Sequence, residues 1–188
     1  MSVETYDAAV SRGDITGVFD IEHLKSIHKS MFDGMLDDAG ELRSVRAYNG
    51  WDEFTKPEQI RMSLGLVCDY IKLENYFRGL SADMLAPKLA AQMAKLDNIH
   101  PFQDGNYQVQ MEFLKQLAAN AGFDLDLSKI SRDDMKIALG QAAVHNYTRL
   151  ISLFQSALTH TGVMGPVVYT PEPEKPRKGL FGLFRRRK

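Results

Sequence analysis

His100-Pro101-Phe102-Gln103-Asp104-Gly105-Asn106 is the stretch that decides the fold, because it separates two segments with helical periodicity. Apolar residues recur at helical spacing over 81–98 before the stretch and over 109–121 after it. Between them the proline disfavours helix at the preceding histidine, and the glycine lets the backbone turn. Asn106 is predicted to be the N-cap of the second helix. The sequence therefore predicts a helix–loop–helix in which free backbone N–H groups, an imidazole and a carboxylate meet, and such a helix start binds anions.

This stretch resembles the signature of the Fic (Fido-fold) family, which reads His-Pro-Phe-x-Asp/Glu-Gly-Asn. Residues 19–28 are similar to the family's opening helix, with the pattern Phe-Asp-x-x-His-Leu-x-x-Ile-His. Residues 39–45 are similar to its Ala-Gly-x-Ile/Leu-Arg-x-Val segment. The resemblance covers roughly residues 15–160. It implies an all-α fold, a Fic/Fido-like helical bundle with one small β-hairpin flap.

The resemblance also implies a chemistry and a role for each matching residue. Fic proteins of this kind are protein nucleotidyltransferases, which move AMP or a related phosphate-containing group from a nucleotide such as ATP to a protein hydroxyl. His100 would be the catalytic base, and Asp104 would hold Mg²⁺. Gly105 and Asn106 would bind phosphate, and Phe102 would anchor the loop in the core.

The sequence departs from the family pattern directly after Asn106. The family continues with Gly or Lys and then Arg, with a second Arg three residues later, whereas this chain has Tyr107, Gln108 and Met111. Gln108 can still bind phosphate, through one neutral hydrogen bond in place of two charged ones. Three functional hypotheses remain. One is a transferase that is weakened or altered in its donor, and the second is an inactive Fic domain that acts as a protein-interaction module. The third, which rests on the basic C-terminal tail, is a secreted or membrane-directed effector.

A hairpin is predicted near residue 50, because Asn49-Gly50 lies between residues that favour strands. An isolated hairpin is marginally stable by itself. In Fic proteins a flap at this position binds an extended target segment by strand addition, so we expect a protein substrate to dock there. The residues expected to contact it are Arg43, Val45, Tyr48 and Trp51. The alternative is a hairpin that only covers the loop.

Other features of the chain are assigned to packing or to regulation. Asp20 is predicted to cap the opening helix, and His23 and His28 are expected in core or interface positions, because their spacing places them on different helix faces. The helix that begins at Pro57 is predicted to continue to Phe77. The family's inhibitory motif, Ser/Thr-x-x-x-Glu-Gly/Asn, has no convincing copy, so a separate antitoxin-like inhibitor is one hypothesis.

Charge and composition divide the chain into a lead-in at 1–19, a Fic-like domain at 20–160, a Pro/Gly linker at 161–174 and a basic apolar tail at 175–188. The tail has seven basic and no acidic residues; without it, the chain's 23 basic and 24 acidic residues become 16 and 24. Such a tail suits an anionic membrane surface or a secretion machine. A solvated tail without a partner is the alternative. The acidic remainder argues against nucleic acid.

The single cysteine, Cys68, has no disulfide partner within the chain. This predicts a reducing compartment, so a cytoplasmic location is expected where the protein is made. Secretion into a target cell and membrane association through the tail are the alternatives. Transmembrane helices are not predicted, because no apolar run reaches the ~20 residues that a membrane span needs.

Overall fold

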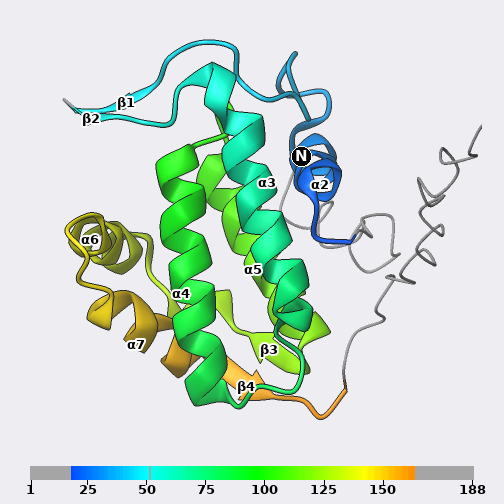
Figure 1. The fold of residues 1–188 in the computed structure, drawn as a ribbon, viewed down its shortest axis with the longest axis vertical. Helices are drawn as coiled ribbons and strands as arrows, with labels where there is room; N and C mark the ends of the chain where they lie inside the picture. Colours follow the sequence, from blue (N-terminus) through cyan, green and yellow to red (C-terminus); the bar gives the residue numbers. More distant parts are fainter. Residues whose placement is uncertain (1–17, 51, 164–188) are drawn as a thin grey trace, which may run out of the picture.

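Six α-helices and two short two-stranded sheets form the part of the chain that the computed structural model describes, residues 18–50 and 52–163 (Figure 1). The predictions for residues 1–17, for Trp51 and for the linker and tail from residue 164 onward lie outside these described residues. The expected helical bundle with a small hairpin is confirmed.

Two long helices, α4 and α5, form the centre of the bundle, and the stretch from His100 to Gly105 connects them. Helices α2 and α3 pack on one side of this pair, and α6 and α7 lie on the other (Figure 1). The helices are α2 (Ile21–Phe32), α3 (Pro57–Leu73), α4 (Ala82–Ile99), α5 (Asn106–Asn120), α6 (Arg132–Ala143) and α7 (Thr148–Ala157). No helix within these described ranges is both long enough and apolar enough to span a membrane.

Local capping signals fix where several helices begin. The Asp20 carboxylate accepts a hydrogen bond from the His23 N–H at 2.8 Å, which confirms the predicted cap of α2. Pro57 is the first residue of α3, where its missing N–H costs nothing. Ser131 accepts from the N–H of Asp134 at 3.0 Å and so begins α6. Short-range chemistry is therefore sufficient for these boundaries.

The end of α3 differs from the prediction. The helix ends at Leu73 and a 3₁₀ turn follows over Asn75–Phe77, whereas the periodicity predicted helix through Phe77. The residues of this turn have positive φ angles between 51° and 61°. Tyr76 and Phe77 are buried there, and Asn120 of α5 donates from Nδ2 to the Tyr76 carbonyl. Burial of two aromatic rings outweighs the local preference for helix.

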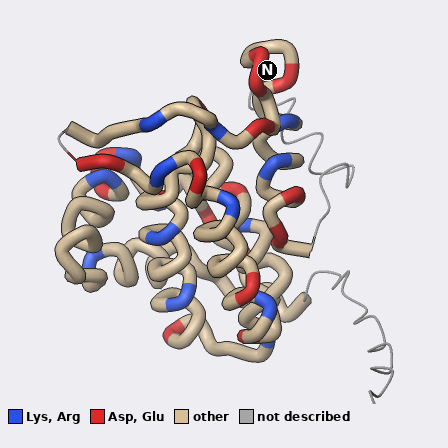
Figure 2. The backbone as a smooth tube through the Cα atoms, turned by 45° about the horizontal axis from the view of Figure 1, so that its top comes forward, with Lys and Arg blue, Asp and Glu red and all other residues tan. Residues whose placement is uncertain are grey.

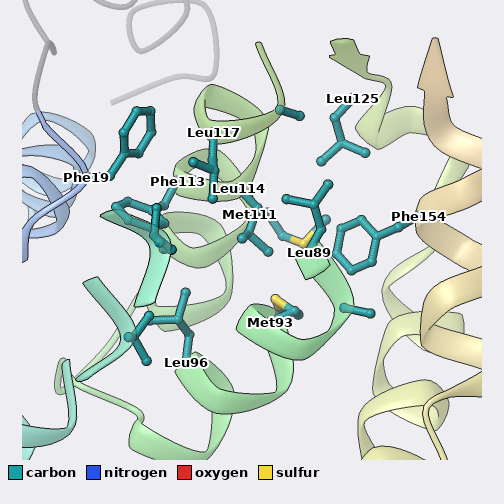
Figure 3. Packing of buried hydrophobic residues seen from close by; sticks show 14 of the residues in the cluster. Phe19, Leu89, Met93, Leu96, Met111, Phe113, Leu114, Leu117, Leu125 and Phe154 are labelled. Atoms are coloured by element: carbon teal, nitrogen blue, oxygen red, sulfur yellow. The ribbon is translucent and has the colours of Figure 1, made fainter. Parts of the chain in front are cut away.

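The core lies between α4, α5 and α7. Figure 3 shows Leu89 and Met93 of α4 beside Met111 and Leu114 of α5, with Phe154 of α7 opposite them. Phe19 packs edge-to-face against Phe113, with ring centroids 5.6 Å apart. These contacts hold the two central helices in fixed relation, and so they position the loop that joins them.

The predicted hairpin is present: β1 (Tyr48–Asn49) pairs antiparallel with β2 (Asp52–Glu53). Gly50 has a φ of +64°, as a tight turn of this kind requires. We call residues 42–55 the flap, with the tip at 44–53 and the remaining residues as its base. A second pair, β3 (Phe123–Leu125) with β4 (Leu158–His160), was not predicted; a 3₁₀ turn, Leu127–Lys129, follows β3.

Candidate functional site

The loop from His100 to Asn106, which we call the motif loop, begins and ends with left-handed backbone. His100 ends α4 with φ 49° and ψ 64°, and its N–H donates to the Leu96 carbonyl at 2.9 Å. Gly105 precedes α5 with φ 71°. A left-handed conformation costs a non-glycine residue about 1–2 kcal/mol, so contacts elsewhere must hold His100 in place.

Asn106 closes the motif loop with its side chain. Its Oδ1 accepts from the N–H of Phe102 at 2.9 Å, and its Nδ2 donates to the Phe102 carbonyl at 2.8 Å. The predicted N-cap role is wrong, because Gly105 is the N-cap and Asn106 is the first residue of α5. The side chain bonds backward into the loop, and α5 begins without a side-chain cap hydrogen bond.

Gly105 is required by space as well as by its backbone angle. A Cβ atom there would lie 2.3 Å from Cε2 of Phe32, the last residue of α2. Helix α2 therefore approaches the loop too closely for any side chain at this position.

His28 of α2 ties the acidic half of the motif loop to the opening helix. Its Nδ1 accepts from the Gly40 N–H at 2.8 Å, so Nε2 carries the proton and donates to the Asp104 carbonyl at 3.2 Å. The ring is stacked on Phe102 at 4.0 Å between centroids, and Phe102 is fully buried. Burial lowers the pKa of His28. His28 and the similarly buried His23 are thus neutral core residues, as expected from their spacing.

Arg43 ties the other half of the motif loop to the flap. The guanidinium donates to the carbonyls of His100 at 2.6 Å, Val45 at 2.7 Å and Ile99 at 3.2 Å, and also to that of Thr55. Only 4% of the residue is exposed. We expected Arg43 to contact a target, but its donors are used inside the domain, so we assign it a structural role.

The His100 side chain is half-buried beneath the flap. Its ring is stacked on Phe54 with 4.0 Å between centroids and an interplanar angle of 8°. Burial lowers its pKa, the Arg43 charge lowers it further, and the Asp97 carbonyl and Asp104 act in the opposite direction. Nδ1 is buried and lacks a hydrogen-bond partner among the described residues. The lowered pKa keeps the ring neutral at pH 7.

The remaining predicted phosphate and metal residues lie around the start of α5. Asp104 and Gln108 are exposed. Met111 is 3% exposed and packs in the core (Figure 3), so its position presents no polar group to a ligand. Basic and acidic residues are interspersed along the described backbone (Figure 2). The element of the loop whose N–H groups and dipole favour an anion is the start of α5.

A cleft of about 860 Å³ lies beside the motif loop, between the flap, α4 and α6. Tyr107 lines it, half-buried, with the Arg132 guanidinium 5.1 Å from the centre of its ring. Burial raises the pKa of Tyr107, so its hydroxyl stays protonated. Asp97 also lines the cleft, and burial raises its pKa to about 6. Sequence reasoning missed Asp97, although an acidic residue one helical turn before His100 was an available signal.

On the flap tip, Val45 is 52% exposed and Tyr48 is 55% exposed. Trp51 lies outside the described residues. Arg46 forms an ion pair with Glu53 across the hairpin at 3.4 Å. His100, Phe102, Asp104 and Asn106 thus lie together in one loop, and Val45 and Tyr48 face solvent on the flap tip.

A helical bundle with a short histidine-containing loop between its two central helices, and a hairpin packed on that loop, is the class of protein that this fold and site define. The Fic/DOC family matches residues 18–118, and the chain belongs to that family. It is 30% identical over 150 residues to the protein adenylyltransferase VbhT of Bartonella schoenbuchensis. The match covers 80% of this chain and 31% of VbhT, so the chain spans about a third of that relative.

Two further likenesses come from bacteria. A probable protein adenylyltransferase Fic of Salmonella typhimurium is 29% identical over 74% of this chain and 70% of its own length. The solved N-terminal Fic domain of a VirB-translocated effector of Bartonella quintana, with bound ADP, has a TM-score of 0.76 and 24% identity. That structural match covers 84% of this chain and 83% of the other.

Proposed function

We propose that this domain is a protein nucleotidyltransferase, which moves AMP or a related phosphate-containing group from a nucleotide onto a protein hydroxyl. The observation that carries the proposal is the motif loop, in which a neutral, half-buried His100 lies next to an uncapped helix start. The names of the relatives VbhT and Salmonella Fic support the reaction type.

In this reaction His100 acts on the target hydroxyl. Nε2 takes the proton, the hydroxyl oxygen forms a bond to the α-phosphorus of ATP, and the bond to pyrophosphate breaks. Nδ1 is buried, so Nε2 is the nitrogen that we assign as the acceptor. A general base typically contributes ~10²–10⁴ in rate. The lowered pKa keeps this base unprotonated at neutral pH.

The phosphates would bind at the start of α5. Gly105 caps the helix without a side-chain hydrogen bond, so the N–H groups of Asn106 and the two following residues point at one place. Donors held in position before the reaction stabilise charge that develops at the phosphorus. The adjoining cleft is large enough for the nucleoside, and the bound ADP of the Bartonella quintana domain supports a nucleotide as the ligand.

The residues present also fit magnesium. Within residues 18–50 and 52–163, no group of three or more His, Cys, Asp or Glu side chains is arranged to hold a metal ion. Magnesium usually keeps several waters and binds through one or two carboxylates together with substrate phosphates. A single exposed carboxylate, Asp104, beside the anion site fits an ion that arrives with the nucleotide. Bound there, the ion would neutralise phosphate charge.

A second candidate function is a protein-interaction module without catalysis. It is favoured by Gln108 and Met111, since neither supplies the charged clamp that the resemblance implies at those positions. Losing one donor of this kind typically costs ~10²–10³ in rate. Either function uses the flap tip as the docking edge for a protein, and either is compatible with a separate antitoxin-like inhibitor.

We also propose that the basic tail at 175–188 directs the domain to an anionic membrane surface or to secretion machinery. Its seven basic residues and its Leu and Phe residues support the proposal. The description of the Bartonella quintana protein as a VirB-translocated effector favours secretion from the cytoplasm in which it is made. A truncation after Val163 that retains both vesicle binding and export would contradict this proposal.

Intact-mass spectrometry tests the transferase proposal. The wild type is incubated with Mg²⁺ and, separately, ATP, GTP, CTP or UTP, with and without a lysate treated to remove small molecules. A mass increase of one nucleoside monophosphate on the domain or on a lysate protein is expected. His100→Ala should abolish it, and the matched control Gln103→Ala, at an exposed position of the same loop, should retain it. Labelling that survives in His100→Ala would exclude the proposed mechanism.

A further inference from the structure

Arg43 is the residue through which the flap and the motif loop are joined. Its side chain bonds to two carbonyls of the flap, those of Val45 and Thr55, and to two at the end of α4, those of Ile99 and His100. Its backbone N–H donates to the Pro101 carbonyl at 2.9 Å. One residue thus holds the backbone on both sides of the His100–Pro101 peptide bond.

The hydrogen bonds of Arg43 resist small movements of the flap base relative to His100. A buried charge is costly unless it is hydrogen-bonded, and the planar guanidinium presents its donors in a fixed fork. Any movement of the flap base relative to His100 would leave donors without carbonyl partners. Burial lowers the pKa of Arg43, and the nearby Glu53 acts in the opposite direction. The side chain nevertheless stays charged, because the ordinary pKa of arginine lies far above neutral pH.

The flap holds the His100 ring in addition to its backbone. Phe54, at the flap base, is the ring stacked on the imidazole at 4.0 Å. Next to it, the Thr55 N–H donates to the Asn98 carbonyl at 3.1 Å. The carbonyl and the ring of His100 are therefore both held by residues of the flap base, while its N–H bonds to Leu96 within α4.

We infer that Arg43 is a positioning residue for His100, and that together with Phe54 it makes the flap base and the motif loop one unit. A target strand that binds the flap tip is then presented to a base whose position is set by the same segment. The role of His100 as the base rests on the proposed function, whereas the coupling between flap and loop does not.

Two substitutions separate the charge of Arg43 from its geometry. Arg43→Lys retains the positive charge but loses the planar fork of guanidinium donors. Arg43→Gln loses both the charge and the fork. The matched control is Arg46→Gln, which removes an exposed arginine of the same flap and leaves these contacts intact. Circular dichroism melts establish that each variant is folded before its site is measured.

The first measurement is an NMR titration of the His100 ring, which needs no catalytic activity. Arg43→Gln should raise the His100 pKa, since the Arg43 charge lowers it. Arg43→Lys should keep the pKa low but move the ring resonance, because the stacking on Phe54 changes when the fork is lost. Arg46→Gln should change neither. Wild-type ring shifts and pKa in both Arg43 variants would overturn the inference.

The second measurement is steady-state transfer. Arg43→Lys should lower kcat by about ten- to a hundredfold, as expected for misplacement of a reacting group by ~1 Å. The donor Kd, measured by calorimetry, should stay unchanged. An unchanged kcat would overturn the inference, whereas a wild type without transfer would defeat the proposed function and leave the NMR result to decide. If both Arg43 variants unfold, Phe54→Leu is measured in their place. An unchanged kcat together with an unchanged His100 pKa in this variant would overturn the inference that the flap base positions His100.

Discussion

The motif loop and the flap tip are both short connections, yet side chains hold the first on every side and leave the second exposed. The side chains of His28, Arg43 and Asn106 all form hydrogen bonds to backbone carbonyls of the motif loop. At the tip, β1 and β2 contain two residues each, and Tyr48 is more than half exposed. The difference indicates that geometric precision resides in the loop, and that adaptability to a partner resides in the tip.

The largest expected effect comes from two glycines with similar backbone angles, one in each region. Gly105→Ala should lower the free energy of unfolding by about 3–5 kcal/mol, because it adds a clash with Phe32 to the cost of the left-handed conformation. Gly50→Ala should cost only about 1–2 kcal/mol, since nothing lies within 4 Å of its added Cβ. Urea denaturation of the two variants measures the difference.

The double variant Phe32→Leu with Gly105→Ala separates the cost of the clash with Phe32 from the cost of the left-handed backbone. The smaller side chain removes the ring that the new Cβ would meet, so the double variant should recover part of the lost stability relative to the sum of the single changes. Equal destabilisation by Gly50→Ala and Gly105→Ala would show that the loop is no more closely packed than the tip.

Asp97, at the end of α4 before the loop, should reduce the stability of the domain at neutral pH. Its pKa is raised from 3.8 to about 6 by burial alone. The folded state therefore favours the protonated form, and stability is lost as pH rises through about 6. Asp97→Asn should raise the free energy of unfolding by about 1–3 kcal/mol at pH 8. The gain should shrink below pH 6 and vanish near pH 4.

A pH series of urea denaturations measures this difference between wild type and variant. Asp133→Asn, an exposed acid on the same cleft for which we expect little change, is the control. A gain from Asp97→Asn that is the same at pH 5 and pH 8 would refute the assignment to burial of its charge.

Gln108→Arg should increase affinity for ATP about tenfold, equivalent to about 1.4 kcal/mol. The residue is exposed at the start of α5, so a guanidinium there can reach solvent and phosphate without disturbing the core. Met111→Arg cannot serve as its counterpart, because Met111 packs in the core with 3% exposure. Calorimetry with ATP and with AMP measures the gain, which should be larger for ATP. Equal gains for both nucleotides would indicate that the outer phosphates lie elsewhere.

Most of the helix boundaries and the hairpin could be predicted from the sequence because their causes are local. Asp20 bonds to an N–H three residues away, and Pro57 begins its helix through its own ring geometry. The hairpin depends on Asn49-Gly50, whose preference for left-handed backbone acts within the turn. The seven residues of the motif loop carried the family resemblance for the same reason, since they are contiguous.

The roles of Arg43 and Asn106 could not be predicted, because they depend on contacts distant in the sequence or on competition between two local bonds. The carbonyls that hold Arg43 include two that lie 56 and 57 residues away. Asn106 is a good N-cap residue by type, but its side chain closes the loop onto Phe102 instead. The left-handed backbone at Tyr76 could not be predicted either, because it depends on the burial of the Tyr76 and Phe77 rings in the folded core.

The smallest expected effect on stability comes from Tyr48→Ala at the flap tip. The side chain is 55% exposed, so its loss should change the free energy of unfolding by less than about 0.5 kcal/mol. If a target adds a strand to the tip, the KM for the protein target should rise several-fold, because an exposed aromatic anchor is lost. The kcat and the donor Kd should stay unchanged, since the base is held by the flap base and not by the tip.

Leu73→Ala is the matched control for Tyr48→Ala, because Leu73 is 85% exposed at the end of α3 and takes no part in the flap. It should leave both the KM and the kcat unchanged. Substitutions in the two regions should therefore affect different kinetic parameters. Changes at the flap tip should act on KM alone, and changes at the flap base on kcat. A fall in kcat for Tyr48→Ala as large as that for Arg43→Lys would mean that tip and base act as one element, and that the exposed tip is as important for the base as Arg43.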